Sequence, residues 1–232
     1  MAENKIEILS TRRLNSQLSG EGEWQHIHVD ANAFIHIIPD VSQETTAQIQ
    51  SLALQPATVI FTSVNSVNAV TTRLTVAPAW KIFCISGATK DALIPFFGAA
   101  SIIASAKNAI LLSEKIIAHG NTKEVVFICG SSRMNHLPER LGAAGIKVNE
   151  LVVYQTVATP IPATKDYKGI LFFSPSAVHS FFSINTTPVH TVLFSIGETT
   201  TAAIEAYCSN KVITSPWPGE ADMLEMVTTY FK

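Results

Sequence analysis

The chain has 232 residues, of which 47% are hydrophobic and 15% are charged, and its formal net charge is −2. This composition predicts a compact globular protein with a large core and excludes a disordered chain. The sequence has no basic run, so nucleic acid is not expected as a partner, and no apolar stretch reaches the roughly 18–20 residues that a membrane span requires.

The start of the chain and its cysteines predict a cytoplasmic protein. Residues 1–5 lead straight into an apolar run and lack the apolar core of a signal peptide. The three cysteines show no CxxC spacing. Cys84 and Cys129 lie in apolar runs, where a free cysteine usually behaves as a small buried hydrophobic residue. We therefore expect a reduced, cytosolic environment.

Six short runs rich in Val, Ile and Phe predict buried strands, and five of them are followed by a helical pattern. Near-continuous apolarity is typical of strands covered on both faces, and strands alternating with helices are typical of a doubly wound α/β fold. Residues 14–25 are polar, and residues 19–23 interrupt their helical pattern, which indicates a loop. The expected strands are 6–10, 58–63, 81–86, 124–130, 169–174 and 191–197, and the expected helices are 66–74, 90–97, 134–144, 176–183 and 200–207.

Three strand-and-turn segments of the first half recur in the second half, and two of them recur with the same offset of 111 residues. Calling the three units A, B and C in the order in which they first occur, the chain runs A-B-C-A-B-C. This duplication predicts two similar lobes of about 100 residues each, facing one ligand. The corresponding segments are 10–13 and 130–133 (A), 59–63 and 170–174 (B), and 82–89 and 193–200 (C).

Two arrangements of the lobes are open. Each half of the sequence could form one lobe, with a boundary near Asn121. Alternatively, the first A unit joins the second B and C units, and the reverse. In that case residues 33–39 and 151–157, which fit no strand–helix unit, would be connector strands between the lobes.

Small hydroxyl residues follow the repeated strands where helices are expected to begin. For any single serine, helix capping is the more common role, and Ser174-Pro175 fits an N-cap and a first helical position. As a set, these turns predict an anion site, because ligands of doubly wound sheets bind at the carboxyl ends of strands, beside helix N-termini. Arg12 and Arg133 lie in the A-type turns and are either carboxylate partners or solvated side chains.

Other site motifs do not occur in the sequence. It contains no GxGxxG after the first strand, no P-loop and no GxSxG elbow. His26 and His28 share a strand face but have no third ligand nearby in sequence, so we expect no metal. Tyr154 differs from the turns because it lies in a connector segment. Such a connector could present its phenol to the ligand, or Tyr154 could be a packed linker residue.

Six short motifs occur in an order and spacing that together cover nearly the whole chain. Each one is weak alone, because small-residue turns are common in α/β proteins, but the ordered set resembles the uroporphyrinogen-III synthase family. Two positions depart from the family pattern: Ser86-Gly87, where the family usually has glycine first, and Glu198, where proline is frequent. The motifs are IFTS at 60–63, SGAT at 86–89, CG at 129–130 with LP at 137–138 and GI at 145–146, VYQT at 153–156, FFSPS at 172–176 and IGETT at 196–200.

The resemblance implies a fold of two doubly wound parallel-sheet lobes, flavodoxin- or Rossmann-like, joined by a two-stranded connector. One lobe is then discontinuous. We expect residues 1–32 with 160–232 in the first lobe, residues 40–150 in the second, and residues 33–39 and 151–159 as the connector strands.

The resemblance also implies the reaction, a cofactor-free and metal-free cyclisation of the linear tetrapyrrole hydroxymethylbilane with inversion of ring D and release of water. Tyr154 matches the family's tyrosine and is the candidate catalytic acid. The expected substrate-binding residues, from the turns and from the resemblance together, are Arg12, Ser63, Ser86, Thr89, Gly130, Ser131, Ser174, Pro175, Ser176, Gly197, Thr199 and Thr200.

A second hypothesis from a different class is a two-lobed, non-catalytic binding or sensing protein for an anionic small molecule, since two hinged α/β lobes fit both descriptions. In either case we expect a monomer whose partner is a small molecule, with no nucleic acid and no membrane involved. The ordered motifs favour the enzyme.

Overall fold

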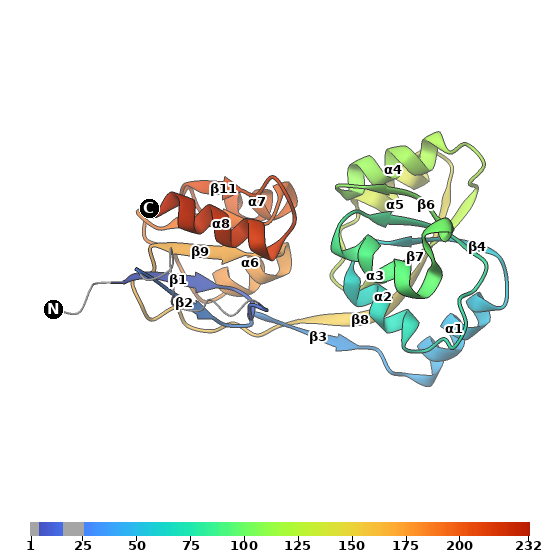
Figure 1. Cartoon of the computed structure of the whole chain (residues 1–232), viewed down its shortest axis with the longest axis horizontal. Helices are drawn as coiled ribbons and strands as arrows, with labels where there is room; N and C mark the ends of the chain where they lie inside the picture. Colours follow the sequence, from blue (N-terminus) through green and yellow to red (C-terminus); the bar gives the residue numbers. More distant parts are fainter. Residues whose placement is uncertain (1–4, 16–25) are drawn as a thin grey trace. The chain divides into compact units, whose positions relative to one another are not determined.

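The computed structural model describes residues 5–15 and 26–232. The chain forms two compact units, which are the blue and orange-to-red part and the cyan-to-yellow part of Figure 1. Unit 1 comprises Met1–His36 with Val157–Lys232, and unit 2 comprises Ile37–Thr156. The chain passes between the units inside two strands, β3 (Ile35–Pro39) and β8 (Lys147–Ala158).

The sheet of unit 1 has the order β11-β10-β9-β1-β2, and its paired strands are parallel. Strand β1, from the first A unit, lies beside β9 and β10 from the second B and C units. The swapped arrangement is therefore the one that the chain adopts. The connections reverse direction between β1 and β9, which makes this pair the switch point of the sheet. The strands are β1 (Ile6–Ser10), β2 (Ile27–Ala31), β9 (Gly169–Phe172), β10 (Val192–Ser195) and β11 (Val212–Thr214).

The sheet of unit 2 has the order β3-β8-β7-β4-β5-β6. Strands β7 and β8 take the places that β1 and β2 take in unit 1, although they come last in the chain. The switch point of this sheet is consequently between β7 and β4. The further strands are β4 (Ala57–Phe61), β5 (Trp80–Ile85), β6 (Ile102–Ala106) and β7 (Glu124–Gly130).

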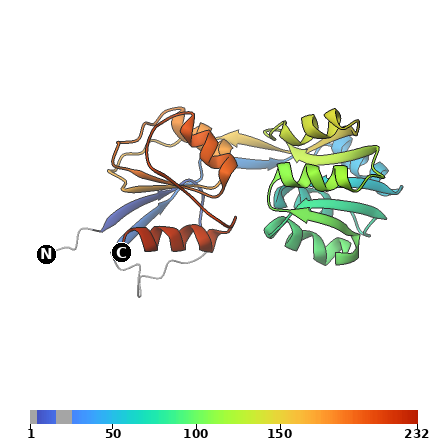
Figure 2. The ribbon, with the colours of Figure 1, turned by 90° about the horizontal axis from the view of Figure 1, so that it is seen from above.

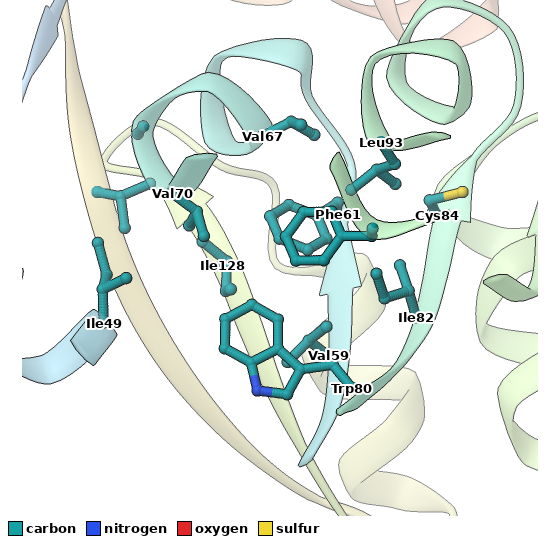
Figure 3. Close-up of a cluster of buried hydrophobic side chains, with 13 residues drawn as sticks. Ile49, Val59, Phe61, Val67, Val70, Trp80, Ile82, Cys84, Leu93 and Ile128 are labelled. Atoms are coloured by element: carbon teal, nitrogen blue, oxygen red, sulfur yellow. The ribbon is translucent and has the colours of Figure 1, made fainter. Parts of the chain in front are cut away.

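Helices cover both faces of each sheet, because successive strand residues point to opposite faces and both sets are apolar. In unit 2, Phe61 packs toward the α1–α3 face with Val67 of α2, as Figure 3 shows, while Ile60 packs toward α4 and α5. In unit 1, α8 covers the face opposite to α6 and α7 (Figure 2). The helices are α1 (Gln43–Ala53), α2 (Val64–Thr71), α3 (Ala88–Phe97), α4 (Ala109–Ala118), α5 (His136–Ala143), α6 (Pro175–Phe182), α7 (Glu198–Glu205) and α8 (Glu220–Tyr230), with a 3₁₀ turn η1 (Ala99–Ser101).

The six expected strands and the five expected helices are all present, which confirms the α/β fold. Six further elements are not predicted by the sequence pattern: β2, β6, β11, α1, α4 and α8. In β2 only Ile27 is buried, and in α1 only Thr45 and Ile49 are, so neither shows the apolar run of a central element. The loop expected at 14–25 lies almost wholly outside the described residues. Among the helices that the structure describes, none is long and apolar enough to span a membrane.

Candidate functional site

Tyr154 lies at the switch point of unit 2 because of an irregularity in strand pairing. Cys129 of β7 pairs with Val152 of β8, but the next residue, Gly130, pairs with Tyr154, so β8 gains one residue at a β-bulge. A bulge redirects the side chains that follow it and occurs often beside functional sites. Here it brings Tyr154 beside the last residue of β7, at the carboxyl end of the sheet.

Gly130 leaves the space in which the phenol ring lies. A Cβ atom at this position would be 2.3 Å from Tyr154 Cε2, 2.4 Å from Cζ and 2.8 Å from the phenol oxygen. Any residue other than glycine would therefore displace the ring. The expectation that Gly130 binds substrate is not tested by this contact, which instead gives the glycine a role in placing Tyr154.

Two hydrogen bonds of Ser131 connect β8 to the turn that follows β7. Its backbone N–H donates to the carbonyl oxygen of Tyr154 at 3.0 Å, and its hydroxyl oxygen accepts from the N–H of Thr156 at 3.2 Å. These two bonds lie on either side of Gln155 and hold the segment that carries the phenol. The Ser131 side chain is itself exposed.

The phenol lies in a half-buried, polar setting at the N-terminus of α2. Burial has the largest effect on the pKa of Tyr154 and raises it, whereas the nearby side chains of Ser63, Ser66 and Asn65 lower it without reversing the rise. Ser63 is also the N-cap of α2, with its Oγ accepting from Asn65 N at 3.1 Å. A phenol with a raised pKa is neutral at pH 7 and can donate a proton.

The C-type turn of unit 2 follows β5 and contains Ser86 and Thr89. Ser86 N–H donates to the carbonyl oxygen of Ala106 at 2.8 Å, and Thr89 is buried in the first turn of α3. Gly87 has φ +75°, a left-handed conformation that favours glycine. Although Ser86-Gly87 departs from the family pattern, glycine is present at position 87, where the backbone conformation requires it.

The B-type and C-type turns of unit 1 begin α6 and α7. Ser174 caps α6, its Oγ accepting from Ala177 N at 3.2 Å, and Pro175 is the first helical residue, as the sequence predicts. After β10, Thr200 N donates to Gly197 O at 2.9 Å. Glu198 begins α7 and is exposed, where its negative charge favours a helix N-terminus.

Arg12 and Arg133 both bind carboxylates of the protein itself. Arg12 Nη2 lies 2.7 Å from Glu220 Oε2, and its guanidinium carbon lies 4.1 Å from the centre of the Phe173 ring. Arg133 Nη2 forms an ion pair with Glu150 Oε2. In both arginines the Nε is buried and has no hydrogen-bond partner among the described residues. Both side chains are therefore held by a glutamate, while 39% of the Arg12 side chain and 27% of the Arg133 side chain remain exposed.

Glu7, His28 and Asp30 are placed closely enough to hold one metal ion. The ammonium group of Lys165 already lies among them, 3.1 Å from Glu7 Oε2 and 2.8 Å from Asp30 Oδ2. A positive charge therefore occupies the position that a cation would take, and these side chains form an ion-pair network on β1 and β2.

The sequence profile of uroporphyrinogen-III synthase HemD matches residues 17–225. The chain belongs to the uroporphyrinogen-III synthase family. The match begins after β1, so it does not include Arg12. No curated protein sequence matches the chain significantly.

Solved synthases of this family share the fold at low sequence identity. The structure of uroporphyrinogen-III synthetase from Helicobacter pylori is 15% identical, with a TM-score of 0.62 over 97% of this chain and 99% of that one. A mutant synthase from Thermus thermophilus is 12% identical, with a TM-score of 0.67 over 98% and 100%. The wild-type Thermus enzyme is 13% identical, with a TM-score of 0.55 over 97% and 96%. These likenesses support the fold.

Within each unit, the fold brings some of the expected site residues of this synthase-family chain together. In unit 2, Ser63, Gly130, Ser131 and Tyr154 surround the switch point, while Ser86 and Thr89 lie one strand further along the sheet. In unit 1, the Arg12 guanidinium lies over Phe173, directly before the B-type turn of Ser174, Pro175 and Ser176, while Gly197, Thr199 and Thr200 lie one strand further.

Four residues of these sites were not predicted from the sequence: Ser66 and Asn65 near the phenol, and Glu220 and Glu150, which bind the arginines. Ser66 and Asn65 looked like ordinary helix residues. Glu220 is 208 positions from Arg12, so no local pattern could connect them. For Ser66 a signal existed, since the 111-residue offset pairs it with an alanine.

Proposed function

We propose that this chain acts as a uroporphyrinogen-III synthase, closing hydroxymethylbilane with inversion of ring D and releasing water and uroporphyrinogen III. The observation that carries the proposal is the family match over residues 17–225. A neutral phenol at the switch point of a doubly wound sheet, where ligands of such folds bind, supports it.

In this proposal Tyr154 is the general acid. Its O–H gives a proton to the hydroxyl group on the ring A methylene, the C–O bond breaks, and water leaves. An azafulvene cation and a phenolate remain. The substituted carbon of ring D attacks the methylene carbon, and the resulting spiro intermediate fragments and recloses with ring D inverted. The proton that ring D loses on regaining aromaticity restores the phenol.

A phenol is a weak acid, and its raised pKa makes it weaker. It suffices here because the hydroxyl departs readily when a pyrrole can stabilise the cation. General acid catalysis of this kind contributes roughly 10²–10⁴-fold to a rate. The acid step is therefore only part of the catalysis.

We propose that the remaining effect comes from holding the substrate curled, with its two reacting ends close together. The bilane is flexible and carries many carboxylates, so fixing its conformation removes an entropic barrier. Backbone N–H groups at helix N-termini can bind carboxylates in a protein of low net charge. The residues proposed to contact substrate are Arg12, Ser63, Ser86, Thr89, Gly130, Ser131, Ser174, Pro175, Ser176, Gly197, Thr199 and Thr200.

We also propose the domain boundaries, the oligomeric state and the location that the sequence predicts. Residues 1–32 with 160–232 and residues 40–150 act as the two lobes, and residues 33–39 and 151–159 connect them. The protein works as a monomer in the cytoplasm, without a cofactor, since the reaction needs only a proton donor and a shaped binding surface.

An assay that supplies hydroxymethylbilane and separates the type I and type III products tests the function. We expect the purified chain to yield mainly the type III isomer, faster than spontaneous closure yields type I. If the product is type I alone, formed at the uncatalysed rate, the enzyme proposal is wrong. Tight binding of the bilane without turnover would then point to the non-catalytic binding protein.

A further inference from the structure

Ser66 is a buried hydroxyl residue for which helix capping gives no explanation. It lies in the first turn of α2 with 0% of its surface exposed. Its Oγ accepts and donates no hydrogen bond within the described part of the chain. Buried polar groups are nearly always paired, so an unpaired one at a candidate site calls for a functional reason.

The functional group close to Ser66 is the phenol of Tyr154. Tyr154 packs against the same core cluster as Val67, the residue that follows Ser66 on α2. Burial raises the pKa of the phenol, and the side chains of Ser63, Ser66 and Asn65 lie near enough to lower it. Ser63 already accepts a hydrogen bond as the N-cap of α2, whereas the buried Ser66 hydroxyl has no partner among the described residues. One titratable group, the thiol of Cys129, also acts on the phenol. Burial raises the pKa of this thiol to about 12, so the thiol is neutral at pH 7.

A comparison with unit 1 supports a link between Ser66 and the phenol of Tyr154, because unit 1 has neither a serine nor a tyrosine at the equivalent positions. The offset of the B-type repeat, 66 + 111 = 177, places Ala177 at the position equivalent to Ser66. Ser10 ends β1 as Gly130 ends β7, and Ser10 pairs with Ala31 where Gly130 pairs with Tyr154.

The three positions thus differ together between the units. In unit 2, Tyr154 of β8 occurs together with Gly130 on the paired strand and the buried Ser66 on the helix. In unit 1, the equivalent positions hold Ala31, Ser10 and Ala177. The glycine is explained by the space that the ring needs. The serine is explained if the phenol oxygen needs a partner.

We propose that Ser66 is a positioning residue for Tyr154, whose hydroxyl donates a hydrogen bond to the phenol oxygen and stabilises the phenolate left after proton transfer. This inference rests on the proposed acid role of Tyr154. A hydroxyl rotates freely, and a hydrogen bond to an ionised oxygen is stronger than one to a neutral oxygen. Ser66 therefore acts mainly when the proton has left, and the returning proton from ring D ends that interaction.

Replacing Ser66 by alanine, as Ala177 does in unit 1, tests the proposal. The titration of the Tyr154 phenol is followed through its ¹³Cζ NMR signal, identified by its loss in Tyr154→Phe. We expect Ser66→Ala to raise the pKa of the phenol by about one pH unit, since a hydrogen bond to a charged group is lost. We also expect kcat for type III formation to fall about 5- to 10-fold with KM unchanged. An unchanged phenol titration overturns the proposal.

Two further variants separate this role from a structural one. Ser180 of α6 is also buried and also lacks a hydrogen-bond partner among the described residues, so Ser180→Ala is a matched control. We expect Ser180→Ala to leave both the titration and kcat unchanged, and equal effects of the two alanine variants would contradict the proposal. Ser66→Cys, which keeps a weak donor, is expected to be intermediate.

The thermal unfolding of Ser66→Ala gives a third readout. Removing an unpaired buried hydroxyl should leave the unfolding midpoint unchanged or raise it, although activity falls. A loss of stability parallel to the loss of activity would instead indicate a structural role and overturn the proposal. If Tyr154→Phe keeps the full type III rate, the acid role fails, while the titration still reports separately whether Ser66 contacts the phenol.

Discussion

The five strands of unit 1 are arranged like five of the six strands of unit 2, but the two units differ at their switch points. In unit 1 the pairing of β1 with β2 is regular through Ser10 and Ala31, and the switch point carries hydroxyl groups and an arginine. In unit 2 a bulge between β7 and β8 places Tyr154 opposite Gly130. Duplication therefore supplies two candidate anion-binding edges, and one extra residue in one strand pair makes one of them a candidate proton-donating site.

Among variants of the unit 2 site, we expect the largest effect from Tyr154→Phe. The variant keeps the ring beside Gly130 but removes the proton, so we expect type III formation to slow by about 10²-fold with the fold preserved. Product analysis and circular dichroism measure the two quantities. The acid role is refuted by wild-type kinetics in a folded Tyr154→Phe protein.

A somewhat smaller effect is expected from Gly130→Ala, which makes unit 2 resemble unit 1 at this position. The new Cβ would lie 2.3 Å from Tyr154 Cε2, so the ring must move. We expect kcat to fall about 10-fold and the free energy of unfolding to fall by about 1–3 kcal/mol, as in an overpacked core. Steady-state kinetics and urea unfolding check both.

Gly142→Ala is the matched control for this variant. Gly142 lies in α5, and a Cβ there would meet nothing within 4 Å. Since alanine favours a helix over glycine, we expect unchanged kinetics and a gain in stability of about 0.5–1 kcal/mol. If both alanine variants lose activity equally, the contact between Gly130 and the phenol is not the cause.

The central strands and the turns of this fold could be predicted from the sequence, but their pairing could not. Strand β7 matches the expected bounds because its residues are buried on both faces and form an apolar run. Edge strands such as β2 expose one face and lack that run. The repeat predicted two similar lobes, yet the swap was inferred from a family resemblance, since periodicity leaves both arrangements open.

The candidate site was predictable in part. Tyr154 and the hydroxyl turns stand out in the sequence. The bulge that aims the phenol depends on how β8 pairs with β7, and nothing in either segment alone specifies it. The arginine partners were equally hidden, because an ion pair between distant residues has no local signature. Serines expected to bind substrate also serve as caps, as Ser63 and Ser174 do.

A moderate effect is expected from the arginine of unit 1. Arg12 already binds Glu220, but 39% of its side chain remains exposed, so it can still take part in carboxylate binding. We expect Arg12→Gln to raise KM about 5-fold with little change in kcat, because binding is weakened equally in ground and transition states. Arg133→Gln, at the equivalent turn of unit 2, is the comparison. An unchanged KM in Arg12→Gln would remove Arg12 from the binding surface.

The smallest effect concerns the pH dependence of stability in unit 1, to which the network of Lys165 with Glu7 and Asp30 contributes. Burial acts to raise the pKa of both carboxyls, but hydrogen bonds from Lys165 and neighbouring groups outweigh it and lower both. Their folded pKa values are below the unfolded ones, so this stability is present above about pH 4.5 and is lost as the pH falls through the folded values. In Lys165→Met, we expect the free energy of unfolding to be slightly lower at pH 7 and to decrease less as the pH falls below 4.5. Amide hydrogen exchange in β1 and β2 measures both effects. Strands β7 and β8 serve as the internal control, and equal changes there would show that the network does not act locally.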